Sequence, residues 1–537
     1  MDLGASQDIL GGHTPCASLV APVIAGAEIL SLSAVEVESI SSRADPLSTA
    51  IEPFYLNFCN VSVVLTHPGA SDTVFVDVWL PTSDWNGRYQ AMGGGGLAAG
   101  YGGLMLAGPL SEGYLTSSTD GGLTLNNTVD PQSGKWALNE DGTSNDDLQL
   151  NLAWRSIHDM VLLSKDLSQQ FYGVEPSYSY WHGCSQGGRQ GYAAAAQYPE
   201  DFDGILAIAP AIYIPELVVA DFWPPVVMQN NTVPPFCVLE EYQRAIIAKC
   251  DPLDGVTDGL ISDHDLLESC PFDPDTLVGH TVSCNSACAT LDIGILMEMD
   301  VPCEGLKELT ITTEHATVVR EILQGPRTSN GKPLWYGLAP GAAFFAVANT
   351  IEDEDGNWIP SPFIVAKSWL KYFVFKHPDY ETTKMSTADY EKAFDISTSQ
   401  LGELWGNQHL NLTAFKDAGG KLLTWMGLAD EYIPPNGMLR FRENLEKQFG
   451  GAEAVDEFQR LFFAPGAGHC SGGHGPLPVD PLIALRGWVE NGTAPETLPA
   501  MTISPENVKV SRNLCRYPKK LIYNEGPVAL ASSFSCA

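Results

Sequence analysis

One short stretch, about a third of the way along the chain, constrains the fold more than any other. Residues 178–181 are YSYW and residues 205–209 are ILAIA, and both patterns are typical of short buried strands. Between them lie GCSQG at 183–187, which fits G-x-S-x-G, and an alanine-rich helical pattern at 189–197. Strand, sharp turn, helix and strand is the order that lifts a nucleophilic serine, here Ser185, out of a parallel sheet.

Neighbouring patterns extend this sheet. Residues 73–80 alternate apolar with polar side chains and end at a proline, and residues 88–92 form a short apolar strand pattern that leads into GGGG. Strand patterns return at 421–426 and 461–464, and residues 148–170 have helical periodicity. Together with the serine turn, these patterns predict the α/β class and an α/β-hydrolase fold.

Beyond Pro210 the sequence changes character. Loop-rich and short-helical runs such as FWPP and WYGLAPGAAF replace the strand patterns until about residue 400. We therefore expect a catalytic domain at 1–210 and 401–537, interrupted by a lid domain at 211–400. An insertion of roughly 190 residues is large enough to form a domain of its own.

The charge balance excludes some classes of partner. Acidic residues outnumber basic ones by 65 to 29, which gives a formal net charge of -36. Nucleic-acid binding needs clustered Lys and Arg, so we expect none. The electrostatic field of this negative charge slows the approach of anionic ligands, so a neutral ester or glycoside is easier to accept as a substrate. No run of 18 apolar residues is present, so we expect no membrane span.

The cysteines and glycosylation sequons favour a secreted, oxidised protein. The chain has twelve cysteines, an even number, and no C-x-x-C pair of the kind that zinc sites use. The first residues, MDLGASQDIL, lack the basic and apolar regions of a signal peptide, so we expect a chain that begins after its leader has been removed. Five N-x-S/T sequons support the same extracellular localisation: Asn60, Asn126, Asn230, Asn411 and Asn491.

A serine nucleophile needs a base, and the base needs a carboxylate that orients it. In this fold the three follow the order Ser, acid, His, each behind a strand. Asp430 follows the strand pattern KLLTWMG, and His469 follows LFFA. The predicted triad is therefore Ser185, His469 and Asp430.

Other residues compete for two of these roles. Glu431 and Asp417 are alternative acids, and an aspartate in such a loop is often only a turn former. His474 is an alternative base in the same glycine-rich loop. His182 is another, although a residue so close to the serine in sequence generally points away from it.

The oxyanion of an ester's tetrahedral intermediate needs backbone N–H donors. We expect one from Gln186, directly after the serine. We expect the other from the GGGG loop, at Gly94 or Gly95, where the missing side chains let the backbone approach the substrate.

Two cysteines adjoin the predicted triad. Cys184 precedes Ser185, and Cys470 follows His469. If the histidine lies within hydrogen-bond reach of the serine, the two cysteines come close enough for a disulfide bond. Such a bond would hold nucleophile and base together covalently.

These motifs resemble a known family. G-C-S-x-G-G with a later G-x-x-H-C, together with the segments CNVSVVLTH, GGGG and KLLTWMGLAD, resembles the tannase and feruloyl esterase family, which includes terephthalate monoester hydrolases. The resemblance implies the triad above and the Cys184–Cys470 bond. With the order of the cysteines it also favours the pairs Cys16–Cys59, Cys250–Cys270 and Cys515–Cys536, while the pairing of Cys237, Cys284, Cys288 and Cys303 stays open.

An acidic loop, CDPLDGVTDGLISD at 250–263, lies in the predicted lid. Its clustered carboxylates suit Ca²⁺, but from the residues alone a solvated acidic turn is an equal alternative. The resemblance favours a structural Ca²⁺ ion, far from the ester. It implies side-chain ligands from Asp251, Asp254 and Asp258, and carbonyl ligands from Val256 and Leu260.

We therefore expect a secreted serine carboxylesterase that acts on aryl esters of plant material, small molecules or feruloylated polysaccharide. Feruloyl esterase is the first choice and tannase the second. A peptidase of the same fold and an inactive binding protein of hydrolase ancestry are the rivals. The acyl and alcohol groups and the oligomeric state stay open. Aromatic residues of the lid are candidate pocket walls, although such residues are more often core: Trp223, Trp335, Tyr336 and Trp358.

Overall fold

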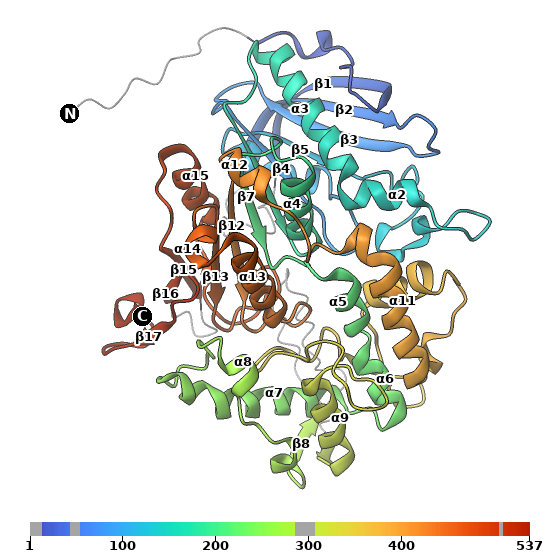
Figure 1. Cartoon of the computed structure of the whole chain (residues 1–537), viewed down its shortest axis with the longest axis vertical. Coiled ribbons are helices and arrows are strands. Elements are labelled where there is room, and N and C mark those ends of the chain that lie inside the picture. The colour runs from blue at the N-terminus through green and yellow to red at the C-terminus, as the bar shows by residue number, and fades with distance from the viewer. Residues whose placement is uncertain (1–12, 43–53, 285–306, 504–508) are drawn as a thin grey trace.

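A nine-stranded sheet forms the centre of the molecule in the computed structural model, which describes residues 13–42, 54–284, 307–503 and 509–537 (Figure 1). The strand order is β1-β2-β3-β5-β4-β6-β7-β12-β13. The strands are β1 (Glu28–Ser42), β2 (Phe54–Thr66), β3 (Val74–Pro81), β4 (Arg88–Met92), β5 (Leu115–Thr119), β6 (Tyr178–Cys184), β7 (Gly204–Ile208), β12 (Lys421–Gly427) and β13 (Gln459–Ala464).

The sheet has an antiparallel and a parallel part. β1, β2, β3 and β5 pair antiparallel, whereas β5, β4, β6, β7, β12 and β13 are parallel. Parallel strands are covered on both faces, which explains why β7 is apolar throughout and completely buried. The carboxyl ends of the parallel strands meet at one edge, where such folds bind their ligands.

Helices cover both faces of this sheet. Side chains of α3 (Ser156–Tyr172), α4 (Gln186–Gln197) and α13 (Pro435–Phe449) share one core cluster with Ile205 and Ala207 of β7. The alternate residues of β7 pack with α15 (Pro481–Asn491) on the opposite face, and α1 (Gly103–Ser111) lies on that face against β2. The period of two in β7 therefore divides the core into two layers.

The helical pattern predicted at 148–170 is interrupted. A π-helical turn at Asn151–Arg155 separates α2 (Asp146–Leu150) from α3. The carbonyls of Leu152 and Ala153 in this turn accept hydrogen bonds from the guanidinium of Arg189, at 3.1 and 3.0 Å. Arg189 is fully buried in α4, so this turn anchors the helix that follows Ser185.

The insertion after β7 forms the end of the molecule opposite β1–β3 (Figure 1). The predicted boundary at residue 400 falls within α11, which ends at Trp405. The indole N–H of Trp405 donates to Gln149 Oε1, at 3.2 Å, which ties the end of α11 to the catalytic part. The helices are α5 (Ile214–Ala220), α6 (Trp223–Asn230), α7 (Phe236–Cys250), α8 (Leu266–Ser269), α9 (Thr313–Gln324), α10 (Ile364–Ser368) and α11 (Thr387–Trp405), and the strands are β8 (Thr281–Cys284), β9 (Lys307–Thr310), β10 (Thr350–Glu352) and β11 (Trp358–Pro360).

The C-terminal segment packs beside β13 and reaches the insertion. The guanidinium of Arg512 lies 2.5 Å from a carboxylate oxygen of Asp258 in the insertion. Lys520 forms ion pairs with Asp263 and Asp265. The strands of this segment are β14 (Leu477–Pro478), β15 (Thr497–Ile503), β16 (Lys509–Cys515), β17 (Leu521–Tyr523) and β18 (Phe534–Cys536), and the short helices before it are α12 (Thr413–Asp417) and α14 (Ala452–Asp456). Within the described ranges, no helix is long and apolar enough to cross a bilayer.

Candidate active site

Ser185 lies at the sharp turn between β6 and α4. Its backbone has φ 62° and ψ -122°, a region that residues with a side chain rarely adopt. The turn is held from both sides, because the N–H of Ser185 donates to the Ile208 carbonyl at 2.9 Å and its own carbonyl accepts from Arg189 N–H at 3.0 Å. The predicted strand, turn and helix are therefore present, with the serine at the carboxyl edge of the sheet.

The turn needs glycine because another backbone packs directly against it. A Cβ atom at Gly187 would lie 2.6 Å from the carbonyl oxygen of Gly94, and one at Gly93 would lie 2.9 Å from Gly187 Cα. The GGGG loop after β4 and the serine turn after β6 therefore touch backbone to backbone. This contact explains the glycine content of both motifs.

Asp430 and His469 form a buried pair behind β12 and β13. The Nδ1 atom of His469 lies 2.9 and 3.1 Å from the two carboxylate oxygens of Asp430. Asp430 is fully buried, and its Oδ1 accepts backbone N–H groups from Tyr432 at 3.0 Å and Ile433 at 2.8 Å. Because Nδ1 of His469 faces the Asp430 carboxylate, the imidazole's Nε2 is left to act as a base.

Glu431, next to Asp430, contacts the same histidine differently. Its Oε2 accepts the backbone N–H of His469 at 3.0 Å. Burial, and then the charge of Asp430, raise the pKa of Glu431 to about 7. Burial lowers the pKa of His469, but Asp430 and Glu431 outweigh it and the net pKa lies above the ordinary value. Asp430 therefore orients the imidazole, and Glu431 holds its backbone.

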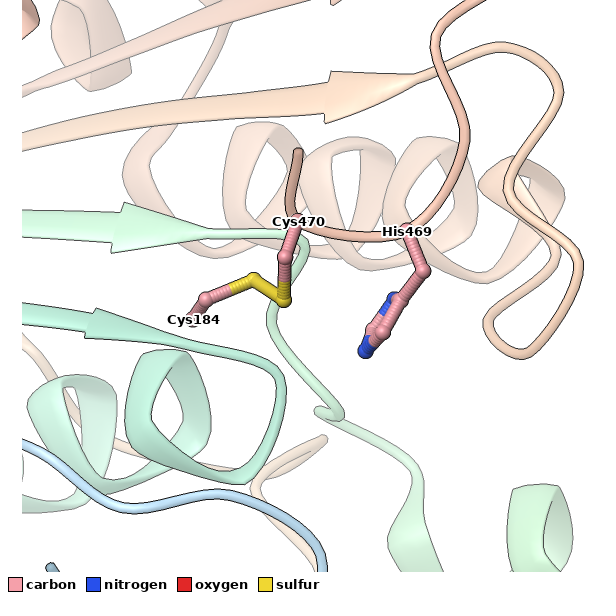
Figure 2. A group of neighbouring side chains, drawn as sticks. All are labelled: Cys184, His469 and Cys470. Carbon is pink, nitrogen blue, oxygen red and sulfur yellow. A yellow bond between two sulfur atoms is a disulfide. The ribbon is translucent and has the colours of Figure 1, made fainter. Parts of the chain in front are cut away.

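The predicted disulfide joins the serine turn to the histidine loop. Cys184 and Cys470 are bonded, with their Cα atoms 5.8 Å apart. Figure 2 shows the His469 ring beside this bond, and a ring nitrogen lies within 4.8 Å of both sulfurs. Because Cys184 and Cys470 are sequence neighbours of Ser185 and His469, the bond brings nucleophile and base to one place.

Ser185 and His469 line the same cavity. Within the described residues Ser185 Oγ makes no hydrogen bond. Catalytic hydrogen bonds commonly tighten only when substrate is bound.

The two predicted oxyanion donors from the GGGG loop are not equivalent. The N–H of Gly94 donates to Gln190 Oε1 at 3.2 Å. Gly95 forms an isolated β-bridge with Ala98, and its carbonyl also accepts from Gln132 and Tyr101. Gln186 occupies the first position of α4, where a helix offers its N–H no partner. Gln186, with Gly94 or Gly95, stays the predicted donor pair.

The cavity has a volume of about 520 Å³ and mostly apolar walls. The insertion supplies Phe345, Phe363 and three residues of α5, and Tyr432 closes the wall beside His469. None of the four lid aromatics considered from the sequence lines this cavity. The sequence carried no signal for Phe345 or Phe363, because which aromatic faces a cavity depends on how distant segments pack.

The other candidate acid and bases do not fit the catalytic roles. Asp417 is exposed at the end of α12, and His474 is exposed and lines a separate cavity of about 70 Å³. His182 lines the main cavity, but burial lowers its pKa to about 4, and its Nδ1 lies 3.5 Å from the Gln90 amide.

Three of the lid aromatics pack in or against the core instead, whereas Trp358 is half-buried in β11. Trp223 packs on Tyr390 with ring centroids 5.1 Å apart, and its indole N–H donates to the Glu321 carbonyl. Trp335 is buried against Tyr336.

The acidic loop follows α7 directly. Backbone N–H groups of Asp258 and Gly259 donate to the Asp251 carboxylate, and that of Ser262 donates to Asp254. The carboxylates of Asp251, Asp254 and Asp258 do not all converge within 4.8 Å in the described part of the chain. Carboxylate oxygens are ligands that suit Ca²⁺, but Asp258 is turned toward Arg512.

All four predicted disulfides are present: Cys16–Cys59, Cys184–Cys470, Cys250–Cys270 and Cys515–Cys536. A fifth joins Cys237 to Cys284, a pairing that the sequence left open. Cys288 and Cys303 lie outside the described residues.

Comparisons with known proteins agree with this geometry. Residues 59–537 match the family model described as tannase and feruloyl esterase. The chain is 42% identical to a probable feruloyl esterase of Arthroderma benhamiae, over 99% of this chain and 95% of the relative. It superposes on the tannin acyl hydrolase from Aspergillus niger with a TM-score of 0.82 and 27% identity, over 97% and 93% of the two chains. The crystal structure of feruloyl esterase B from Aspergillus oryzae shares the fold, with a TM-score of 0.74 and 24% identity over 97% and 99%. The chain therefore belongs to the tannase and feruloyl esterase family.

Proposed function

We propose that this chain is a secreted feruloyl esterase, a serine carboxylesterase that hydrolyses hydroxycinnamoyl esters of plant cell-wall material. The observation that carries the proposal is the Asp430–His469 pair, linked through a disulfide to the strained Ser185 at the wall of an apolar cavity. The names of the relatives point to the acyl group. The alternative, a galloyl ester hydrolase, is supported by the likeness to the tannin acyl hydrolase.

In the proposed mechanism, Ser185 Oγ attacks the ester carbonyl while Nε2 of His469 takes its proton. Asp430 stabilises the imidazolium that forms, and the N–H groups of Gln186 and of Gly94 or Gly95 stabilise the oxyanion. The imidazolium then returns the proton to the leaving alcohol. Water, deprotonated by His469, cleaves the resulting acyl-enzyme and releases the acid.

A panel of methyl esters tests the proposal: ferulate, caffeate, p-coumarate, sinapate and gallate. We expect kcat/KM to be highest among the hydroxycinnamates and Ser185→Ala to lose at least about 1,000-fold on each of them with an unchanged melting temperature. Activity on gallate alone would favour the tannase alternative. Activity on peptides alone would favour a peptidase, and a folded protein with no esterase activity would favour a binding protein.

We also propose that the loop at 250–263 binds a structural Ca²⁺ ion. The carboxylates of Asp251, Asp254 and Asp258, with the carbonyls of Val256 and Leu260, would hold it, which requires Asp258 to turn from Arg512. The chemistry of the donor set and the crowding of three carboxylates support this proposal.

Chelation and one variant test the ion. A ligand that binds only the folded state stabilises it by mass action. EDTA or Asp254→Ala should therefore lower the melting temperature by several degrees, while the exposed variant Asp417→Ala should not. Activity at low temperature should survive, since the ion does no chemistry. An unchanged melting curve with no calcium in elemental analysis would dismiss the site.

Secretion and glycosylation belong to the same proposal. Five disulfides between described residues support an oxidising compartment. Asn60 is a poor acceptor, because it is half-buried inside β2 and its Oδ1 is enclosed. A glycosidase that removes N-linked chains should reduce the mass of the secreted protein, and deamidation should mark the used sites, while no mass change would reject glycosylation. The other four sequons are exposed, namely Asn126, Asn230, Asn411 and Asn491.

A further inference from the structure

One carboxyl group in the cavity has no role in the proposed mechanism. Asp221 caps the C-terminal end of α5, where its backbone N–H donates to the Leu217 carbonyl at 2.9 Å. The residue is only 7% exposed, and it lines the same cavity as Ser185 and His469. Its neighbours on the cavity wall from α5 are apolar: Ile214, Leu217 and Val218.

The carboxyl of Asp221 has no partner in the described part of the chain. No hydrogen bond and no ion pair reaches its side chain there, and no basic residue influences it. Burial, and then the charge of Asp430, raise the pKa of Asp221 well above its ordinary value. The carbonyl groups at the end of α5 also disfavour a negative charge. Burial therefore favours the undissociated acid, which can both donate and accept a hydrogen bond.

Three other polar residues of the cavity wall are already engaged. Gln132 bonds the GGGG loop through Leu97 N–H and the Gly95 carbonyl, and Tyr101 bonds the same carbonyl. Glu431 accepts the backbone N–H of His469. Asp221 is thus a carboxyl that faces the cavity with its hydrogen-bonding capacity unused.

This arrangement is costly for the empty protein. An enclosed carboxyl without a partner loses its hydration and gains nothing in return, so an apolar side chain would suit the site better for folding. A polar group kept at such a cost indicates a ligand that satisfies it.

Building on the proposed function, we propose that Asp221 is a specificity-determining residue that binds the ring oxygens of the acyl group. Its carboxyl matches a 4-hydroxy-3-methoxyphenyl ring, because its C=O can accept the phenolic O–H while its own O–H donates to the methoxy oxygen. An unsubstituted ring would leave the acid unpaired, and a buried unpaired group is penalised strongly.

Two variants test this assignment on four methyl esters: ferulate, p-coumarate, 3,4-dimethoxycinnamate and cinnamate. Asp221→Leu is nearly isosteric but apolar, so it should lower kcat/KM for ferulate about 10- to 100-fold, mainly through KM, while kcat/KM for cinnamate should stay the same or rise. Asp221→Asn retains a donor and an acceptor and should restore much of the preference for ferulate over cinnamate. Val218→Ala, a control in the same wall, should alter the four esters alike.

Stability gives an independent readout. Asp221→Leu should melt at the same temperature as the wild type or higher, because it removes an unpaired buried carboxyl. A fall in melting temperature, or a parallel loss on all four esters, would overturn the inference and indicate a structural role.

Failure of the proposed function is distinguishable from failure of this inference. If the wild type rejects every hydroxycinnamate but cleaves benzoates, the function is wrong, and the same variants are compared on methyl gallate and methyl benzoate. A preference for the hydroxylated ring that Asp221→Leu abolishes would then support the inference, and an unaltered preference would overturn it.

Discussion

Asp430 and Glu431 are adjacent in the chain but act on different parts of His469. The first lies completely buried and contacts the imidazole, whereas the second reaches the backbone N–H of the same residue. Both negative charges favour the protonated imidazole and so oppose the burial that lowers its pKa. Asp430 and Glu431 together therefore raise the pKa of His469, although only Asp430 orients its imidazole.

This division of roles predicts the pH dependence. His469 must be neutral to accept a proton, so kcat/KM should rise with pH through the raised pKa of His469. Glu431→Gln removes one charge that raises this pKa, so the acid limb should move to lower pH with at most about a 10-fold loss on the plateau. Asp430→Asn should instead lose roughly 10,000-fold. Full pH profiles of both variants, with Asp417→Asn as an exposed control, measure this, and an acid limb that Glu431→Gln leaves unmoved would contradict it.

Chain order and strand ends made the triad predictable from the sequence. Asp430 and His469 each follow a strand pattern directly, and parallel strands end at one edge. Gly94 and Asp221 show the limit of that reasoning. The N–H of Gly94 is bonded to Gln190, which is 96 residues further along the chain. Asp221 lines the cavity only because of the way α5 packs, and no pattern within either segment encodes these contacts.

At the scale of elements, the site consists of four loops, which follow β4, β6, β13 and β12. Gly187 and Gly94 bring the first two into backbone contact, and the Cys184–Cys470 bond joins the second to the third. The sequence separation of this disulfide is 286 residues. A bond across so long a loop stabilises the fold by about 5 kcal/mol in the chain-entropy model, yet a large core and other disulfides reduce its weight.

The disulfide should matter more for activity than for stability. In Cys184→Ala/Cys470→Ala, a small displacement of His469 from Ser185 is costly to proton transfer, so we expect a loss of about 100-fold or more in kcat. The control Cys515→Ala/Cys536→Ala, whose bond lies in the C-terminal segment, should lower the melting temperature but keep its activity. Full activity in the first double variant, or two free thiols at 184 and 470 in peptide maps, would contradict the proposal.

Across the whole molecule, the insertion and the catalytic part share one core cluster. This continuity explains why composition alone could not locate the domain boundary at 400. The helix α11 runs across that residue, and its last residue, Trp405, packs against Arg189 of the catalytic part. The strands and helices of the sheet could be predicted because each one is encoded by the pattern of side chains within its own segment. The walls of the cavity and the pairing of Cys237 with Cys284 required the packed chain.

A buried cluster of charged side chains links the end of β2 to α3. His67 lies between Asp72 and Asp159, with nitrogen–oxygen distances of 2.5 and 2.9 Å, and Asn151 of the π-helical turn also donates to Asp72. Burial lowers the pKa of His67, but its bonds to Asp159 and Asp72 outweigh burial and raise the pKa to about 9. The imidazolium therefore contributes to folding stability while it stays protonated.

This cluster predicts a loss of stability at alkaline pH. Because the folded pKa lies above the ordinary value of 6.5, the contribution is complete below pH 6.5 and disappears as the pH rises through about 9. A shift of this size corresponds to roughly 3 kcal/mol. The melting temperature of the wild type should fall between pH 7 and 10, whereas His67→Gln should be less stable at pH 6 and change less with pH. An exposed control, His409→Gln, should follow the wild type; identical pH curves for His67→Gln would contradict this role.

The most direct test of the account is the identity of the nucleophile. A fluorophosphonate probe reacts with serine only where a base activates it. After complete inactivation, peptide mass spectrometry should find one adduct per chain, on Ser185, and none in Ser185→Ala. His469→Ala and Asp430→Asn should be labelled far more slowly than the wild type. An adduct on a different residue, or full esterase activity in folded Ser185→Ala, would contradict the central claim.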